Sequence, residues 1–240
     1  MKVKFQGTIP KESTEFSSNE DVFCINYDNK KVVLCDGASE SFAAKEWATV
    51  LANQYIESEC INAEWLEKAR FNYSIQFDKS DFSWSKLASY SRGSFSTLLG
   101  LTFDEDKKKV ELLSIGDCIA ILFDGNVKIN TFHYLESCEF SHRPLLLASE
   151  SKYDSFSNDD VISEINTGVW DLQHFEFPHI LVMSDALGEW FLKMYERNNT
   201  SEWSQLLEIE DTESFLNLIE HNRKNNSIRL DDTTLISLKL

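Results

Sequence analysis

The segment KVVLCDGASESF, residues 31–42, marks the point where an apolar strand gives way to a helix. Its apolar run ends at Cys35, and the acidic Asp36 stands directly before Gly37. Acid–glycine pairs most often make turns, so this segment alone predicts no more than the end of a strand. Its meaning depends on whether the same arrangement recurs elsewhere in the chain.

The residues around this segment predict hairpins and helices. Apolar, β-branched runs on both sides of a turn at Asp28 predict a hairpin with strands at 22–27 and 31–35. Apolar residues at helical spacing then predict two helices, at 39–56 and 61–77.

The second half of the chain predicts more strands than helices. Three β-rich runs predict an antiparallel meander at 95–103, 109–115 and 118–123. Residues 130–178 show no regular pattern. After them the sequence predicts a buried strand turning into a helix, a second helix and a closing strand, at 179–197, 212–224 and 231–240. Strands in hairpins with helices grouped between them are typical of a layered α+β fold.

Length and composition predict a single domain spanning residues 1–240. Hydrophobic residues make up 42% of the chain, and no linker, repeat or low-complexity tract interrupts it. The N-terminus lacks the features of a signal peptide, and no apolar run is long enough to span a membrane, so we expect a cytoplasmic protein. Tryptophans at amphipathic positions are expected in the core: Trp47, Trp65, Trp84 and Trp190.

The acidic charge and the missing motifs argue against several classes of function. A formal net charge of −17 disfavours nucleic acid or an anionic membrane as a partner, because both need a basic surface. The cysteines and histidines lack zinc-type spacing, and neither a nucleotide-binding P-loop nor a serine-nucleophile elbow is present. The plain explanation of the charge is a solvated surface. The alternative is that some carboxylates converge to hold cations.

The arrangement at Asp36 recurs at other strand ends. Four times an apolar strand begins or ends at an acid beside a turn, and a further acidic pair opens the first hairpin; these acids are Asp36, Asp117, Asp185, Asp231 with Asp232, and Glu20 with Asp21. Any one of them alone is more simply a turn residue. Together at one rim of a sheet, they would repel one another and raise their own pKa values unless cations held them.

Carboxylates without histidine or cysteine suit Mg²⁺ or Mn²⁺. A pair of such ions activates water for in-line attack on a phosphoester. The acids alone therefore indicate a two-metal phosphohydrolase as one candidate function.

The order and spacing of six short motifs resemble the metal-dependent protein phosphatases of the protein phosphatase 2C family. The resemblance runs from about Asn19 to the C-terminus and is strongest to the compact bacterial branch of the family. Its motifs are NED (19–21), LCDGASE (34–40), GSFSTLLGL (93–101), SIGDCIAIL (114–122), LVMSDALGEW (181–190) and DDTTLISL (231–238). It implies a four-layer α-β-β-α sandwich of two antiparallel sheets flanked by helices, with a metal site at one end.

The resemblance also implies roles for the acids around two metal ions. Asp36 would bridge both ions, and Gly37 would offer its backbone carbonyl to one of them, where a Cβ would crowd the ion. Asp185 and Asp231 would complete the shell of the first ion. Glu20 and Asp21 would serve the second ion, largely through water.

The remaining acids have less certain counterparts in the family. Asp117 with Asp185 would form a weaker third metal site, to which Glu189, one helical turn after Asp185, could contribute. A turn acid at Asp117 and an exposed helix acid at Glu189 are equally good explanations. Asp232 stands where the family has asparagine, so it ranks below Asp231 as a ligand.

The sequence departs from the family at two positions. Phe16 stands where the family commonly has an arginine that grips the substrate phosphate, and Ala38 stands where the eukaryotic enzymes have a histidine proposed as general acid. Arg92 or Arg143 could supply a bidentate phosphate contact, although an ordinary surface or capping role is the simpler interpretation for each.

Two functions of different classes follow from the resemblance. The first is a Mg²⁺- or Mn²⁺-dependent phosphatase that acts on phosphoserine or phosphothreonine in proteins and opposes a cognate Ser/Thr kinase. The second is a pseudophosphatase, an interaction module that binds a phosphorylated or regulatory partner without turnover. Phe16 and Ala38 favour the second; the retention of every expected metal acid favours the first.

Overall fold

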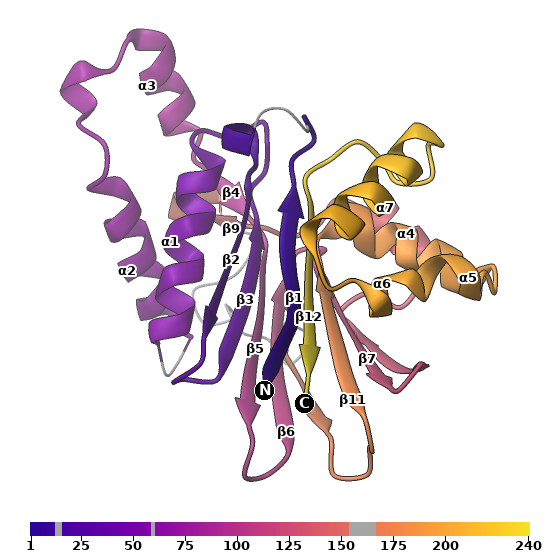
Figure 1. The fold of residues 1–240 in the computed structure, drawn as a ribbon. Coiled ribbons are helices and arrows are strands. Elements are labelled where there is room, and N and C mark those ends of the chain that lie inside the picture. Colours follow the sequence, from indigo (N-terminus) through magenta and orange to yellow (C-terminus); the bar gives the residue numbers. More distant parts are fainter. Residues whose placement is uncertain (13–15, 59–60, 154–166) are drawn as a thin grey trace.

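Two five-stranded antiparallel sheets lie face to face at the centre of the molecule (Figure 1). The structure, a computed structural model, describes residues 1–12, 16–58, 61–153 and 167–240. The first sheet runs in the order β1 (Lys2–Ile9), β12 (Thr233–Lys239), β11 (Pro178–Met183), β7 (Ile119–Asp124) and β8 (Val127–Phe132). The second runs β10 (Thr167–Asp171), β6 (Lys109–Ile115), β5 (Leu98–Asp104), β3 (Lys31–Asp36) and β2 (Asp21–Asn26).

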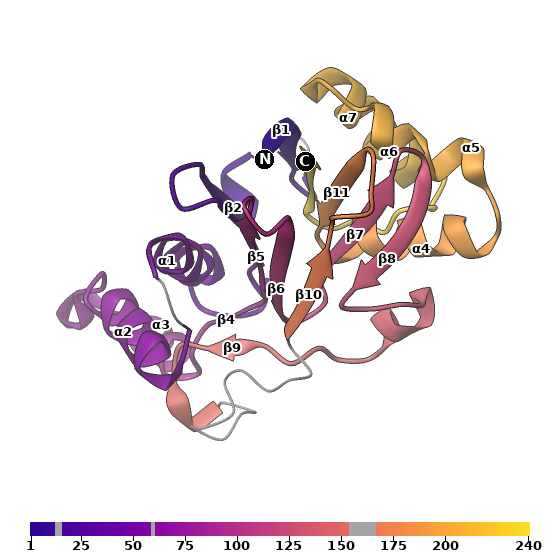
Figure 2. The same cartoon turned by 90° about the horizontal axis from the view of Figure 1, so that it is seen from below.

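Helices cover the outer face of each sheet, as the view along the layers shows (Figure 2). On the side of the second sheet lie α1 (Ala44–Glu57), α2 (Ala63–Ser74) and α3 (Trp84–Ser91). On the side of the first sheet lie α4 (Asp185–Glu196), α5 (Thr200–Trp203), α6 (Gln205–Glu208) and α7 (Thr212–Lys224). The predicted α+β sandwich of four layers is therefore confirmed.

Short elements complete the described chain. A two-stranded sheet joins β4 (Phe95–Ser96) to β9 (Leu147–Ala148). Four 3-10 helices are η1 (Phe16–Ser18), η2 (Lys79–Asp81), η3 (Ser137–Ser141) and η4 (Ser151–Tyr153). Part of the segment predicted to be irregular, residues 154–166, lies outside the described residues; the rest contains β9, β10 and the last half of β8.

The middle of β3 is apolar because both of its faces are buried in the core. Side chains alternate along a strand, so Val33 and Cys35 pack with α1 while Val32 and Leu34 pack between the two sheets. Because both faces are buried, β3 is held firmly between α1 and the first sheet. This fixes the position of Asp36, the acid at its end.

The predicted meander is wrong in its last strand. β5 and β6 pair as expected, but β7 crosses into the first sheet and lies between β11 and β8. Gly116 makes the crossing possible, because its φ of +108° lies in the left-handed region that glycine tolerates best. The crossing gives β7, which is apolar on both faces, one neighbouring layer on each side.

Two further expectations need correction. The first helix begins at Ala44, five residues later than predicted, after Ala43 adopts a left-handed conformation with φ of +46°. Trp84 is not a core residue: it is 86% exposed at the start of α3, a helix that the apolar pattern did not predict.

Among the described residues, no helix has both the length and the apolarity needed to cross a membrane.

Candidate metal centre

Three acids meet at the end of the sandwich opposite the two termini (Figure 1). Asp36 ends β3, Asp117 lies in the crossing from β6 to β7, and Asp185 begins α4. Antiparallel pairing brings these element ends to one edge although they are far apart in sequence. One carboxylate oxygen from each acid lies within 4.8 Å of the others.

Backbone hydrogen bonds hold Asp36 in place. Its N–H donates to Thr97 Oγ1 over 2.7 Å, and the Thr97 N–H donates back to the Asp36 carbonyl over 2.9 Å. Gly116 lets Thr97 approach, since a Cβ at position 116 would lie 2.6 Å from Thr97 Cβ. Burial raises the pKa of Asp36 well above its ordinary value, and the charges of Asp21 and Asp117 raise it further.

Gly37 lies against the start of α1, where a side chain would not fit. A Cβ at this position would lie 2.9 Å from the backbone carbonyl carbon of Ala44 and 3.0 Å from its oxygen. The start of α1 therefore packs directly on Gly37. This backbone contact alone requires glycine here, and the crowding of an ion stays a prediction.

Asp21 lies opposite Asp36 in the β2–β3 register. Thr234 donates a hydrogen bond to Asp21 Oδ2 over 2.6 Å, while Oδ1 is buried and has no hydrogen-bond partner among the described residues. Burial raises the pKa of Asp21 to about 7, and the charge of Asp232 contributes to that rise. Glu20, next in sequence, also has a buried oxygen without a hydrogen-bond partner among the residues described, 3.6 Å from Lys11 Nζ.

Asp232 uses both of its carboxylate oxygens to bind backbone. Oδ1 accepts from the Lys11 N–H and Oδ2 from the Glu20 N–H, each over 2.7 Å. The side chain is buried and joins the start of β12 to the chain that leads into β2. These contacts give Asp232 a structural role, and its lower-ranked place among the metal ligands stays a prediction.

Asp231 and Glu189 face Arg229, a residue that the sequence analysis did not assign. Arg229 Nε lies 3.6 Å from Asp231 Oδ2, and Nη1 lies 3.4 Å from Glu189 Oε2. Arg229 Nη2 also forms an ion pair with Asp185. The sequence carried one signal of this contact, because the basic Arg229 stands only two residues before the predicted ligand Asp231.

The two arginines suggested for phosphate binding have local or solvent-exposed positions. Arg92 caps the C-terminus of α3 and donates to Ser89 Oγ over 2.9 Å. Arg143 is exposed between η3 and β9. Within the described residues, no hydrogen bond or ion pair joins either arginine to the clustered acids.

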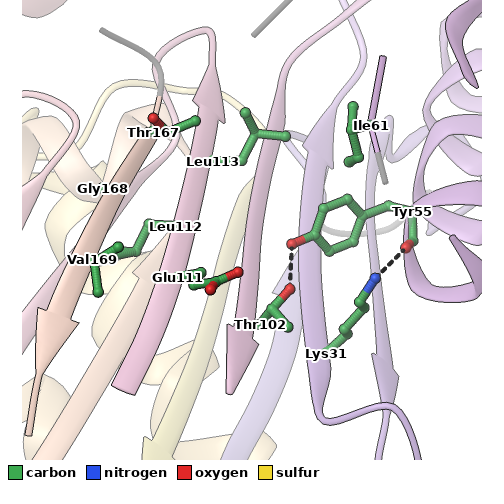
Figure 3. A pocket seen from close by; sticks show the side chains of 10 residues that line it. All are labelled: Lys31, Tyr55, Ile61, Thr102, Glu111, Leu112, Leu113, Thr167, Gly168 and Val169. Carbon is green, nitrogen blue, oxygen red and sulfur yellow. Dashed lines mark hydrogen bonds between the residues drawn. The ribbon is translucent and has the colours of Figure 1, made fainter. Parts of the chain in front are cut away.

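A separate cavity of about 230 Å³ lies on the outer face of the second sheet, beside α1 (Figure 3). Tyr55 from α1 reaches into it and shares a hydrogen bond of 3.1 Å with Thr102, and Glu111 and Val169 line the strands opposite. None of the clustered acids lines this cavity. It therefore does not belong to the candidate metal centre.

The acids fit a pair of hard divalent cations. The donors are oxygens, the three nearest carboxylates come within 4.8 Å of one another, and the buried Asp21 Oδ1 still lacks a partner in the described chain. The third site that the resemblance implies, at Asp117, Asp185 and Glu189, suits a metal ion less well. There Arg229 already pairs with Asp185 and Glu189.

Comparison with solved structures gives fold matches over nearly the whole chain. A bacterial serine phosphatase superposes with a TM-score of 0.58 and 17% identity, covering 98% of this chain and 96% of its own. The chain has the fold of bacterial serine/threonine phosphatases. Stp1 from Staphylococcus aureus gives a TM-score of 0.59 at 18% identity, covering 97% of this chain and 93% of that one.

PstP/Ppp from Mycobacterium tuberculosis, a serine/threonine phosphatase, gives a TM-score of 0.54 at 15% identity over 91% of both chains. By sequence, the chain matches no protein-family model and no curated protein. The predicted resemblance is confirmed at the level of the fold.

Proposed function

We propose that this chain is a Mg²⁺- or Mn²⁺-dependent phosphatase that hydrolyses phosphoserine and phosphothreonine esters in proteins. The observation that carries the proposal is the meeting of Asp36, Asp117 and Asp185 at one end of the sandwich, their oxygens within 4.8 Å. The shared fold supports it, since the solved structures of this fold named above are serine or serine/threonine phosphatases.

The proposed ligands surround Asp36. Asp36 would contact both ions, with the Gly37 carbonyl beside it; Asp185 and Asp231 would hold one ion, and Asp21 with Glu20 the other. When bound, the ions supply Lewis acidity, which makes water a better nucleophile near neutral pH and offsets charge on the phosphoryl oxygens. Mn²⁺ and Mg²⁺ suit this donor set equally well.

The chain's own contribution is to hold the carboxylates close together in spite of their repulsion. Thr97 fixes the backbone of Asp36, and Thr234 orients Asp21. Asp232 would position Glu20, the residue before β2, by accepting its backbone N–H, and would not itself be a ligand. Because the folded scaffold raises the pKa of Asp36 and Asp21, cation binding would release protons.

The partners follow from the reaction. The substrate would be a phosphorylated protein, and a Ser/Thr kinase would supply the modification that the phosphatase removes. Arg92 and Arg143, both exposed, remain candidates for a phosphate contact. Cytoplasmic location and a single domain over residues 1–240 stay predictions.

Turnover of p-nitrophenyl phosphate and of a phosphothreonine peptide tests the proposal. We expect hydrolysis with Mn²⁺ or Mg²⁺, none with EDTA, and a loss of about 100-fold or more in Asp36→Asn and Asp185→Asn, which remove charge from the proposed centre. Asp106→Asn is the matched control: it neutralises an exposed acid in the β5–β6 turn at the opposite end of the sheet and should leave turnover unchanged.

A wild-type chain that folds and binds Mn²⁺ yet turns over neither substrate would contradict the catalytic proposal. Phe16 and Ala38 would then point to the alternative, a module that binds its partner without turnover. In that case Asp36→Asn should leave partner affinity largely intact.

A further inference from the structure

Arg229 faces three acids of the centre with three different nitrogens. Nη2 pairs with Asp185 Oδ2, Nη1 lies 3.4 Å from Glu189 Oε2, and Nε lies 3.6 Å from Asp231 Oδ2. The side chain is 36% exposed, so it lies at the rim of the cluster. A planar guanidinium suits this arrangement because its donors point in fixed, diverging directions.

The acids around Arg229 already face cationic side chains, which disfavours a further cation among them. Glu189 Oε1 accepts from Lys193 Nζ, so both of its oxygens face cationic side chains. The charge of Arg229 also lowers the pKa of Asp117, against the larger effect of burial, which raises it. Arg229 thus acts electrostatically on Asp117 as well as on Asp185 and Glu189, the three acids that the resemblance assigns to a third ion.

A guanidinium and a divalent cation would compete for these acids. Arginine stays protonated at any working pH, so its charge is present whatever the metal concentration. An ion entering this corner would have to displace Arg229 from two carboxylates or lie beside it. Like charges this close repel each other, and a divalent ion feels twice the repulsion that a monovalent ion would.

We propose that Arg229 takes the place of a third metal ion, so that the chain binds two divalent cations and keeps the guanidinium as a permanent third cationic group. The inference rests on the proposed two-metal centre. It makes Arg229 a positioning residue that holds Asp185 and Asp231 at the rim, and it assigns Glu189 to Arg229 rather than to a metal.

Metal stoichiometry tests the proposal without any need for turnover. We would dialyse the full chain against Mn²⁺ and measure bound metal per chain by mass spectrometry. The wild type should bind about two ions, and Arg229→Met about three, the third more weakly. Adding Glu189→Gln to Arg229→Met should remove the third ion, whereas Glu189→Gln alone should leave the count at two.

Arg197→Met is the matched control, because it removes an exposed arginine at the end of α4 and should not change the count. Melting temperature gives a second readout. Arg229→Met should melt below the wild type in EDTA and gain more from Mn²⁺ than the wild type gains. A purely structural role of Arg229 would lower both melting temperatures equally, which would overturn the inference.

The outcomes separate the two proposals. A wild type that binds three ions, with Glu189→Gln reducing them to two, overturns the role of Arg229 and leaves the metal centre standing. An unchanged count of two in a folded Arg229→Met also overturns it. If the wild type binds no Mn²⁺, the proposed function itself fails. Should Arg229→Met not fold, the wild-type and Glu189→Gln counts still decide.

Discussion

At the scale of one residue, burial changes the acidity of Asp21. Burial raises its pKa to about 7 against the hydrogen bond from Thr234, which lowers it. An unfolded aspartate has a pKa of about 3.9, so the folded chain binds the Asp21 proton more tightly than the unfolded chain does. The stability that this proton contributes is therefore complete at low pH and is lost as pH rises from about 4 to about 7.

We accordingly expect the melting temperature in EDTA to fall by several degrees between pH 5 and pH 8. Asp21→Asn should flatten part of this slope, because the amide does not titrate, and Mn²⁺ should reverse it in the wild type by favouring the charged acids. Thermal unfolding monitored by circular dichroism across this pH range measures the effect. A metal-free chain that becomes more stable toward pH 8 would contradict the assignment.

Sequence predicted the acids of the centre better than it predicted their contacts. Asp36, Asp117 and Asp185 each stand at the end of an apolar strand, and that local pattern is enough to bring them to one edge. The contacts of Asp232 and Arg229 depend on where distant chain segments pass, namely Lys11 and the first turns of α4. Beyond the closeness of Arg229 to Asp231 in the sequence, nothing in the local pattern encodes such directions. The backbone contacts of Asp232 and the ion pairs of Arg229 with α4 therefore emerged only from the structure.

At the scale of elements, the errors in the predicted fold have a similar cause: a local pattern does not determine which distant segments meet. The strands were predictable because alternating or continuous apolar runs have a fixed relation to burial. The partners of β7 were not, because a run buried on both faces fits either sheet and only the turn at Gly116 decides between them. α3 escaped prediction because only Tyr90 of its residues is buried, which leaves a weak apolar pattern.

Gly188 determines how closely α4, and with it Asp185, packs on β7. A Cβ there would lie 2.8 Å from Ile119 Cγ1 and 3.2 Å from Phe140 Cζ. Glycine to alanine within a helix normally stabilises by up to about 1 kcal/mol. Here we expect Gly188→Ala to lower the free energy of unfolding by about 1–3 kcal/mol, because the added methyl overpacks the contact.

A double-mutant cycle checks the cause. Ile119→Ala creates space beneath Gly188, so the double variant should cost less than the sum of the two single variants, measured by urea unfolding in EDTA. Strict additivity would mean that the two residues do not share this contact. A Gly188→Ala variant as stable as the wild type would remove the packing argument altogether.

At the scale of the whole molecule, charge and site position act together. The chain carries 40 acidic and 23 basic residues, a formal net charge of −17, and gathers its buried acids at one end of the sandwich. A field of this sign repels anionic ligands at long range and attracts cationic ones. The proposed substrates bear an anionic phosphoryl group, so the residues that flank it should strongly affect the rate of encounter.

For a phosphatase of this charge, we expect phosphothreonine peptides flanked by lysine and arginine to be hydrolysed with kcat/KM about tenfold higher than peptides flanked by aspartate and glutamate at low ionic strength. Salt should shrink the ratio, because the Debye length falls from about 30 Å at 0.01 M to about 8 Å at 0.15 M. Steady-state rates of two peptides that differ only in these flanks, measured at both salt concentrations, give the comparison. A preference that salt leaves unchanged would instead locate selectivity in short-range contacts at the rim of the site, and equal rates at both concentrations would show that net charge does not guide the substrate.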